Sequence, residues 1–171
     1  KAKVNKCAQN QTGDGRGERH RGDGSKKQKT VLNSLYCNAR SIVSKIKELE
    51  LIADENKSDI ILITESWCNS ETSNNLLNIP NYFIDPKRRA DRNDTYNGIG
   101  GGLLVYVRNG LHILSCDNNS DFNQYCTFNI LNDDKTTDFV VTLVYRSPNS
   151  NQENTDKLCE LVKDLPETDN H

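Results

Sequence analysis

The chain contains no methionine, no Cys-x-x-Cys pair and no long apolar run. Because translation starts at methionine, a chain that begins at Lys1 is expected to be a processed piece or a fragment. The six cysteines and three histidines lack the spacing of a zinc site, which favours reduced thiols in an intracellular protein. Without a transmembrane-length segment or a signal peptide, the sequence predicts a soluble protein, nuclear or cytoplasmic, with no membrane partner.

Charge is distributed unevenly along the 171 residues, a length that suits one domain. Residues 1–29 carry nine Lys and Arg against three Asp and Glu, a net charge of +6. The remaining residues carry thirteen against twenty-one, a net charge of −8. Residues 1–29 hold Val4 as their only large aliphatic side chain, so the sequence predicts a disordered basic segment there and one domain over 30–171. This asymmetry favours a polyanionic partner, and a solvated linker explains it equally well.

The hydrophobic pattern predicts a mixed α+β layered domain. Ser41 is expected to cap the first helix, and Asn109-Gly110 predicts a hairpin between the two strands that flank it. The apolar run at 59–64 indicates a strand buried on both faces. Expected strands are 31–37, 59–64, 82–84, 103–108, 111–115, 125–131 and 138–145, and expected helices are about 42–56 and a last one that ends before Pro166.

Polar side chains follow three of these strands. Asn38, Glu65, and Tyr145 with Asn149 stand at strand ends, where layered folds usually place their chemistry. These oxygen and nitrogen donors suit a hard divalent cation such as Mg²⁺ and a phosphate, but not zinc or thiol chemistry. Ordinary roles remain open: a surface ion pair for Glu65, a turn for Asn38, and a loop with a helix cap for Asn149.

Basic residues in the middle of the chain form a second candidate site. Arg88, Arg89 and Arg92, together with Arg146, have the chemistry to hold a nucleic-acid backbone, although charge runs are more often solvated surface. The glycine-rich run Gly98–Gly102 precedes a strand instead of joining a strand to a helix. It therefore fails the context of a dinucleotide cradle, and close backbone packing explains it better.

Four of these motifs, taken in order, resemble one known family. The resemblance covers about residues 31–166 and points to the endonuclease/exonuclease/phosphatase superfamily, in the branch of apurinic-type endonuclease domains from non-LTR (LINE-type) retrotransposons. The segments that carry it are Asn38–Ser41, a helix with Lys45 and Glu48-Leu49, Asp59–Trp67, Arg89–Arg92 followed by Gly100–Val107, and Val144–Asn149. It implies a four-layer α/β sandwich, here partial, and Mg²⁺-dependent hydrolysis of a DNA phosphodiester, whose nick primes reverse transcription in the parent protein.

The resemblance also implies roles for single residues. Glu65 matches the metal-ligand glutamate, and Asn38 matches the asparagine that helps to hold metal and phosphate. Tyr145 and Asn149 match residues that line the scissile phosphate. It implies one Mg²⁺ site, a DNA duplex as the partner and no small-molecule cofactor, and it leaves the oligomeric state open.

The chain departs from that family after its last helix. The family's later Asp-x-Asn motif, a further aspartate and a terminal Asp-His pair are absent, and Asp121-Phe122-Asn123 copies the first motif too early in the chain. The chain is therefore expected to be the N-terminal half of such a domain, inactive alone, and whether it is itself an enzyme stays open. The alternatives are a non-catalytic nucleic-acid-binding remnant of a retroelement and, ranked below it, a phosphatase of the same superfamily.

Overall fold

The structure, a computed structural model, describes residues 3–8, 31–91, 100–115, 124–131 and 137–165. Two helices and two short 3₁₀ turns accompany the strands in these ranges. The strands are β1 (Lys3–Ala8), β2 (Val31–Asn38), β3 (Ile60–Thr64), β4 (Tyr82–Ala90), β5 (Leu103–Arg108), β6 (His112–Ser115), β7 (Tyr125–Leu131) and β8 (Thr137–Val144). The helical segments are η1 (Val43–Lys45), α1 (Ile46–Glu55), η2 (Asn74–Leu77) and α2 (Gln152–Lys163).

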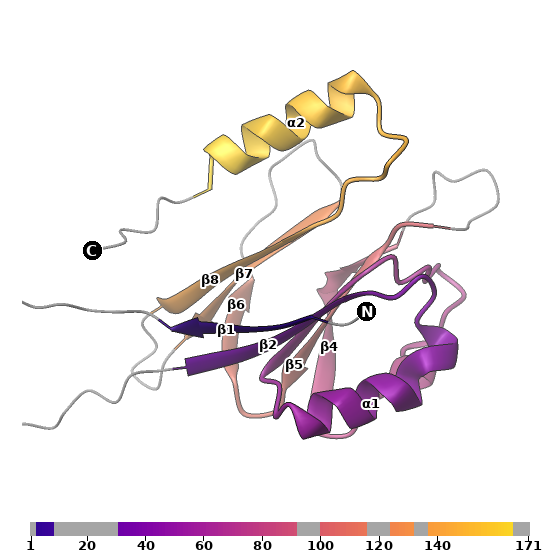
Figure 1. Ribbon diagram of the computed structural model, residues 1–171, viewed down its shortest axis with the longest axis vertical. Coiled ribbons are helices and arrows are strands. Elements are labelled where there is room, and N and C mark those ends of the chain that lie inside the picture. Colours follow the sequence, from indigo (N-terminus) through magenta and orange to yellow (C-terminus); the bar gives the residue numbers. More distant parts are fainter. Residues whose placement is uncertain (1–2, 9–30, 92–99, 116–123, 132–136, 166–171) are drawn as a thin grey trace, which may run out of the picture.

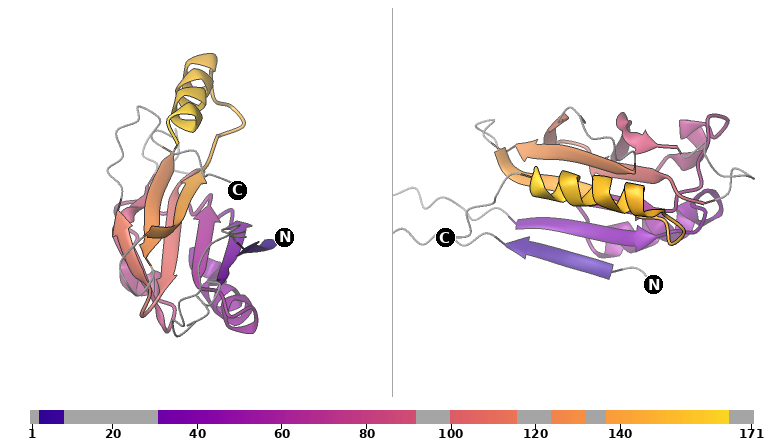
Figure 2. Two further views of the ribbon diagram at one scale, coloured as in Figure 1. Left: turned by 90° about the vertical axis from the view of Figure 1, so that its left-hand side faces the viewer. Right: turned by 90° about the horizontal axis from the view of Figure 1, so that it is seen from above.

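The strands form two sheets that lie face to face (Figures 1 and 2). The first sheet has the order β1-β2-β3-β5-β4, and the second has the order β6-β7-β8. Strands β2 and β3 are parallel and are joined through α1, while the other pairs are antiparallel. Parallel pairing brings the carboxyl ends of β2 and β3 to the same edge of the sheet.

Strand β3 is buried on both faces, which confirms the prediction from its continuous apolar run. Ile61 and Ile63 face the cluster under α1, where Ile46, Leu49 and Ala53 of the helix are buried. Ile60 faces the opposite cluster, which lies between the sheets. That inter-sheet core also contains Leu103, Val105 and Val107 from the first sheet, and Cys126, Phe128, Ile130, Phe139 and Leu143 from the second.

Helix α2 covers the outer face of the second sheet. Its Leu161 and Leu158 pack against Tyr125 of β7 and Val144 of β8. The layers are therefore α1, the five-stranded sheet, the three-stranded sheet and α2, which confirms the expected mixed α/β sandwich (Figure 2). Neither helix in the described ranges is long and apolar enough to cross a membrane.

The predicted hairpin at Asn109-Gly110 is wrong. Strand β5 pairs with β3 and β4, whereas β6 pairs with β7 in the other sheet. Gly110 has the positive φ of a tight turn, 98°, so the local turn forms as the dipeptide indicates. The turn carries the chain from one sheet to the other, because Val107 on one side and Ile113 on the other both contribute to the inter-sheet core.

Two further expectations differ from the structure. Ser41 does not cap the first helix: it has a φ of 76°, and the helical segment begins with the 3₁₀ turn η1, whose N-cap is Ile42. Lys3–Ala8, expected to be disordered with the rest of 1–29, forms β1 against β2. An edge strand offers unpaired backbone groups to any chain segment, so pairing there needs no apolar side chains. Residues 9–29 lie outside the described residues.

Candidate functional site

Three of the predicted site residues meet in one hydrogen-bonded group. Asn38 ends β2 opposite Thr64, and Glu65 is the next residue after Thr64. The amide Nδ2 of Asn38 donates to Glu65 Oε1 at 3.0 Å. Tyr145, which follows β8 in the other sheet, donates its hydroxyl to the same Oε1 at 2.9 Å. The Glu65 carboxylate therefore joins the ends of both sheets.

The surroundings of Glu65 favour its ionised form. Partial burial acts to raise the pKa of Glu65, but the hydrogen bonds from Asn38 and Tyr145 and the charge of Arg40 outweigh it, so the pKa lies below the ordinary value. Glu65 is therefore a carboxylate at neutral pH.

The backbone around Glu65 adopts unusual conformations. Glu65, Trp67, Arg40 and Ser41 all have φ between 45° and 76°, a region that non-glycine residues rarely occupy. Backbone bonds hold this segment in place: Ser41 N donates to Glu65 O at 3.0 Å, and Trp67 N donates to Gly101 O at 3.1 Å. Such strain persists where surrounding contacts fix it, which is typical of functional sites.

Close backbone packing at the glycine-rich run is confirmed for its described part. Ser66 N donates to Gly102 O at 3.2 Å. A Cβ at Gly102 would lie 2.5 Å from Ser66 Oγ, so only glycine fits there. The glycine run therefore supports the Glu65 segment from the β5 side.

The donor set fits a hard divalent cation. Because a carboxylate only accepts hydrogen bonds, the Asn38 amide must turn Nδ2 toward Glu65, and its Oδ1 is left as an acceptor. Both hydrogen bonds to Glu65 fall on Oε1 in the described part of the chain, which leaves Oε2 for a cation. Mg²⁺ takes one or two carboxylates and keeps several waters, so this small set suits it. The described ranges contain no group of three His, Cys, Asp or Glu side chains able to hold a metal.

Two cysteines close to the site in sequence belong to the core. Cys37 of β2 and Cys68 lie in the core under α1, and burial raises the pKa of both thiols. A raised pKa keeps a thiol protonated and unreactive at neutral pH. These two cysteines therefore act as small core residues.

The other predicted residues are not joined to this group. Asn149 is exposed in the loop between β8 and α2, and no contact places it on Glu65 within the described residues. Arg146 is exposed and donates from Nη2 to Thr155 Oγ1 of α2 at 2.9 Å. The side chain of Arg88 and the whole of Arg92 lie outside the described residues. The assigned roles of Asn149, Arg88, Arg92 and Arg146 stay predictions.

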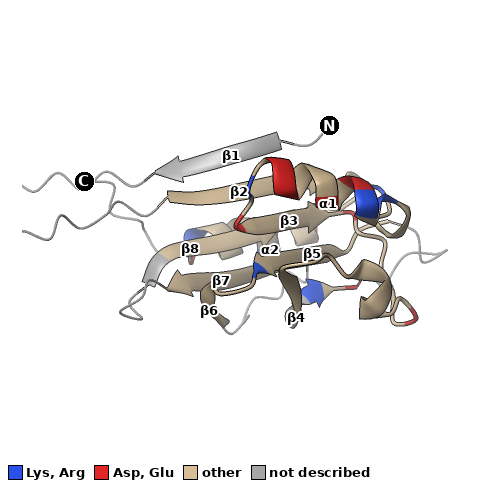
Figure 3. Cartoon of the chain, turned by 90° about the horizontal axis from the view of Figure 1, so that it is seen from below, with Lys and Arg blue, Asp and Glu red and all other residues tan. Residues whose placement is uncertain are grey.

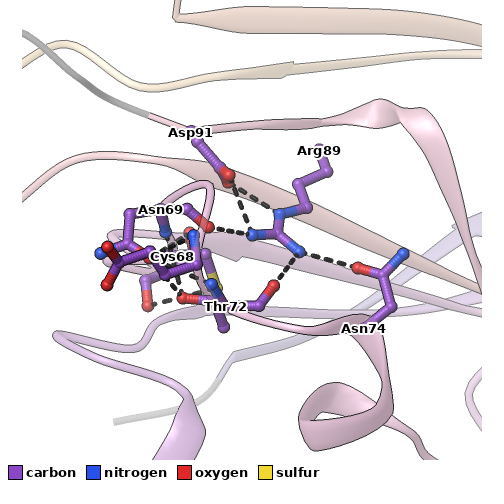
Figure 4. A network of polar contacts seen from close by, with 8 residues as sticks. Cys68, Asn69, Thr72, Asn74, Arg89 and Asp91 are labelled. Atoms are coloured by element: carbon purple, nitrogen blue, oxygen red, sulfur yellow. Dashed lines mark hydrogen bonds and ion pairs between the residues drawn. The ribbon is translucent and has the colours of Figure 1, made fainter.

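Arg89 has its guanidinium fully engaged by the protein (Figure 4). Nε and Nη2 donate to the two oxygens of Asp91, at 2.8 and 2.9 Å. Nη1 donates to Thr72 O and Asn74 Oδ1, and Nη2 also donates to Asn69 O. All five N–H donors of an arginine are then in use, so a role in phosphate binding stays a prediction that this geometry disfavours.

Two site residues escape the sequence-based reasoning. The charge of Arg40 acts on Glu65. Lys45 donates its Nζ to the carbonyl oxygens of Ala39 and Arg40, and so fastens the turn that follows Asn38. The signal for Arg40 is its place two residues after Asn38, whereas the Lys45 contact depends on the positive φ values of the turn, which no sequence pattern indicates.

A cavity of about 550 Å³ opens at the other end of the first sheet, away from Glu65. Its lining includes Asp54 in α1 and Lys57 just beyond it, together with Tyr82 and Arg108. Acidic and basic residues lie close together on and beside α1, while the strands are mostly uncharged (Figure 3). This mixed lining indicates no ligand class, and the cavity is separate from the Asn38–Glu65–Tyr145 group.

Comparisons with known proteins found a similar solved structure and a matching family. Among solved structures, the chain is similar to the endonuclease domain of TRAS1, a telomere-specific non-LTR retrotransposon, with a TM-score of 0.50 and 14% identity. The alignment covers 78% of this chain and 54% of that one, so the chain spans about half of the TRAS1 domain. No curated protein sequence matches it. The profile of the endonuclease/exonuclease/phosphatase family matches residues 32–167, and the chain therefore belongs to that family.

Proposed function

We propose that the chain carries the first part of a Mg²⁺-dependent DNA endonuclease site, of the kind found in non-LTR retrotransposons. The observation that carries this proposal is the Asn38–Glu65–Tyr145 group, in which two sheets present one ionised carboxylate between two neutral donors. The similarity to the TRAS1 endonuclease domain supports the choice of DNA as the substrate.

Each residue of the group has a distinct task in this proposal. Glu65 binds Mg²⁺ through Oε2 while Asn38 and Tyr145 hold Oε1. Asn38 orients a metal-bound water or a phosphate oxygen through Oδ1, and Asn149 lines the scissile phosphate from the neighbouring loop. When bound, Mg²⁺ stabilises negative charge on the phosphate and on the leaving oxygen.

The hydrolysis also needs a base for the attacking water and an acid for the leaving group. The Asp-x-Asn strand and the late Asp-His pair that the family uses are absent from the 171 residues. We therefore propose that residues 30–171 are the N-terminal half of the domain in a longer parent protein. That parent nicks target DNA to prime reverse transcription, and the 171 residues alone bind the cation without cleaving.

Isothermal titration with Mg²⁺ tests the metal site directly. We expect the chain to bind one Mg²⁺ and Glu65→Gln to weaken binding at least about tenfold, because the substitution removes the only charged ligand of the group. Glu55→Gln is the matched control: Glu55 is an exposed carboxylate at the end of α1, so its loss leaves the affinity unchanged. Equal weakening by both variants would show binding by general negative charge and would contradict the proposal.

A nuclease assay separates the competing functions. With Mg²⁺ and supercoiled DNA, the proposal expects binding without nicking by the 171 residues, and nicking once the missing motifs are supplied as the matching C-terminal half of a related domain. DNA binding that ignores both Mg²⁺ and Glu65→Gln would favour the non-catalytic nucleic-acid-binding protein instead. Release of phosphate from a small phosphate monoester would favour the phosphatase.

A further inference from the structure

We propose that Arg89 is a positioning residue for Glu65: it anchors the segment that leaves the site and so holds the metal-binding carboxylate in place. This inference rests on the proposed function for the role of Glu65. It also gives Arg89 a structural role in place of the phosphate contact that the sequence predicts.

The first support is the saturation of the guanidinium. Its five N–H donors meet five acceptors, and the side chain is 11% exposed. Two acceptors belong to Asp91, just after the end of β4, and the other three belong to residues 69–74. Arg89 therefore fastens this loop to β4, as Figure 4 shows.

The loop of residues 69–74 is also stabilised by hydrogen bonds of its own. Asn69 Oδ1 accepts from the backbone N of Glu71 and of Thr72, both at 3.1 Å, and from Thr72 Oγ1 at 3.0 Å. The carbonyl groups of Asn69 and Thr72 are thereby presented together to the guanidinium. A rigid loop transmits the position of its anchor to the residues that precede it.

The residues that precede this loop lead directly back to Glu65. Only Ser66, Trp67 and Cys68 separate Glu65 from Asn69, and Ser66 and Cys68 are buried. Glu65 and Trp67 have φ values of 52° and 57°, which cost free energy and persist only where the surrounding structure holds them. The glycine run holds Ser66 and Trp67 through backbone bonds, and Arg89 holds the loop that follows Cys68.

Arg89 cannot bind a phosphate without giving up this anchor. Four of the five acceptors are partly buried, and an N–H donor turned from any of these to DNA would leave the acceptor unpaired, which is unfavourable. Lysine cannot replace Arg89, because an ammonium has three donors and lacks the planar fork that reaches five acceptors on two segments.

The experiment compares Arg89→Lys with Arg108→Lys in the full 171-residue chain. Arg108 is the matched control, since its Nη1 lies 3.4 Å from Asp59 Oδ1 at the opposite end of the same sheet. Trp67 is the only tryptophan, so its fluorescence reports on the Glu65 segment without any metal. We expect Arg89→Lys to shift the Trp67 emission and to raise the Mg²⁺ Kd about tenfold, as changes to groups that orient metal ligands do. Arg108→Lys is expected to alter neither.

The outcomes separate this inference from the proposed function. A merely stabilising Arg89 would lower the melting temperature but leave the emission and the Mg²⁺ Kd of the folded protein unchanged, which would overturn the inference. If Arg89→Lys does not fold, Asp91→Asn provides the second test, because it weakens two of the five bonds and is expected to give a smaller shift in the same direction. If the unaltered chain binds no Mg²⁺, the proposed function fails. The metal-free Trp67 emission of the two arginine variants then still tests whether Arg89 positions the Glu65 segment.

Discussion

At the scale of single residues, the site depends on how Glu65 is held as a carboxylate. Its neighbours supply two neutral hydrogen bonds and one positive charge, and together they outweigh the burial that disfavours ionisation. Because the folded pKa is lowered, ionised Glu65 contributes stability that is present above its unfolded pKa, the ordinary value of a glutamate. That contribution is lost as the pH falls through the lower folded pKa.

Tyr145→Phe tests this balance. The substitution removes one hydrogen bond to Glu65 Oε1 and keeps the aromatic ring, so the pKa of Glu65 is expected to rise toward its ordinary value. The acid loss of stability still begins near the unfolded pKa, but it is smaller and is complete at a higher pH than in the unaltered chain. Carboxyl carbon NMR of Glu65 measures the titration midpoint. Tyr36→Phe is the control, because that hydroxyl bonds to Thr64 Oγ1 and not to Glu65; an equal shift in both variants would contradict the assignment.

At the scale of elements, the strand ends keep pairing after regular structure stops. Residues 41–42 bond to 65–66, and 66–67 bond to 101–102, so an irregular ladder of three segments continues the first sheet. Positive φ values occur in all three segments. The ladder turns the Glu65 side chain toward Tyr145 of the other sheet, since Tyr145 donates to it.

Gly102→Ala is expected to disrupt this ladder. The new Cβ would meet the buried Ser66 Oγ at 2.5 Å, at a φ of +85°. We expect the free energy of unfolding to fall by about 2 to 4 kcal/mol, from backbone strain and overpacking together. Gly110→Ala is the matched control: its φ is +98°, but nothing lies within 4 Å, so only a strain of about 1 kcal/mol remains. Denaturant unfolding measures both, and equal decreases would show that the close approach to Ser66 carries no cost.

Elements with a strong periodic pattern could be predicted from the sequence, and their partners could not. The bounds of β5 and β7 match the prediction because an apolar or alternating pattern marks each strand. Asn109-Gly110 specifies a local turn. Whether the two flanking strands pair with each other or join different sheets depends on the inter-sheet core, which involves distant residues. In the same way, Glu65 and Tyr145 could be predicted as site residues because they follow strands. The full hydrogen bonding of the Arg89 guanidinium could not be predicted, because its partners lie in a loop some twenty residues away.

At the scale of the whole molecule, the site exists only where the two sheets pack together. Glu65 follows a strand of the five-stranded sheet and Tyr145 follows a strand of the other, 80 residues later. The buried Phe128, Leu103 and Val105 lie in the core that holds the sheets face to face. Loss of inter-sheet packing would therefore separate the carboxylate from one of its donors even if each sheet stayed intact.

Charge is also unevenly distributed at this scale, and under the proposed function it governs binding to DNA. Residues 30–171 carry a net charge of −8, which repels phosphates, whereas residues 1–29 carry +6. We expect the basic segment to supply most of the electrostatic affinity for duplex DNA. Replacing its six Lys and Arg beyond β1 by glutamine leaves the Lys3–Ala8 strand unchanged. These residues are Arg16, Arg19, Arg21, Lys26, Lys27 and Lys29.

The glutamine variant is expected to bind duplex DNA more weakly and with a smaller salt dependence. For every phosphate that the protein no longer neutralises, the slope of log Kobs against log salt concentration becomes shallower by about 0.9. Shuffling the order of residues 9–29 at constant composition is the matched control, and it leaves the slope unchanged because the interaction depends on charge and not on sequence. Fluorescence anisotropy at several salt concentrations measures the slopes. An unchanged slope in the glutamine variant would place the DNA-binding surface on the folded domain, where Arg40 and Arg146 are exposed near the strand ends.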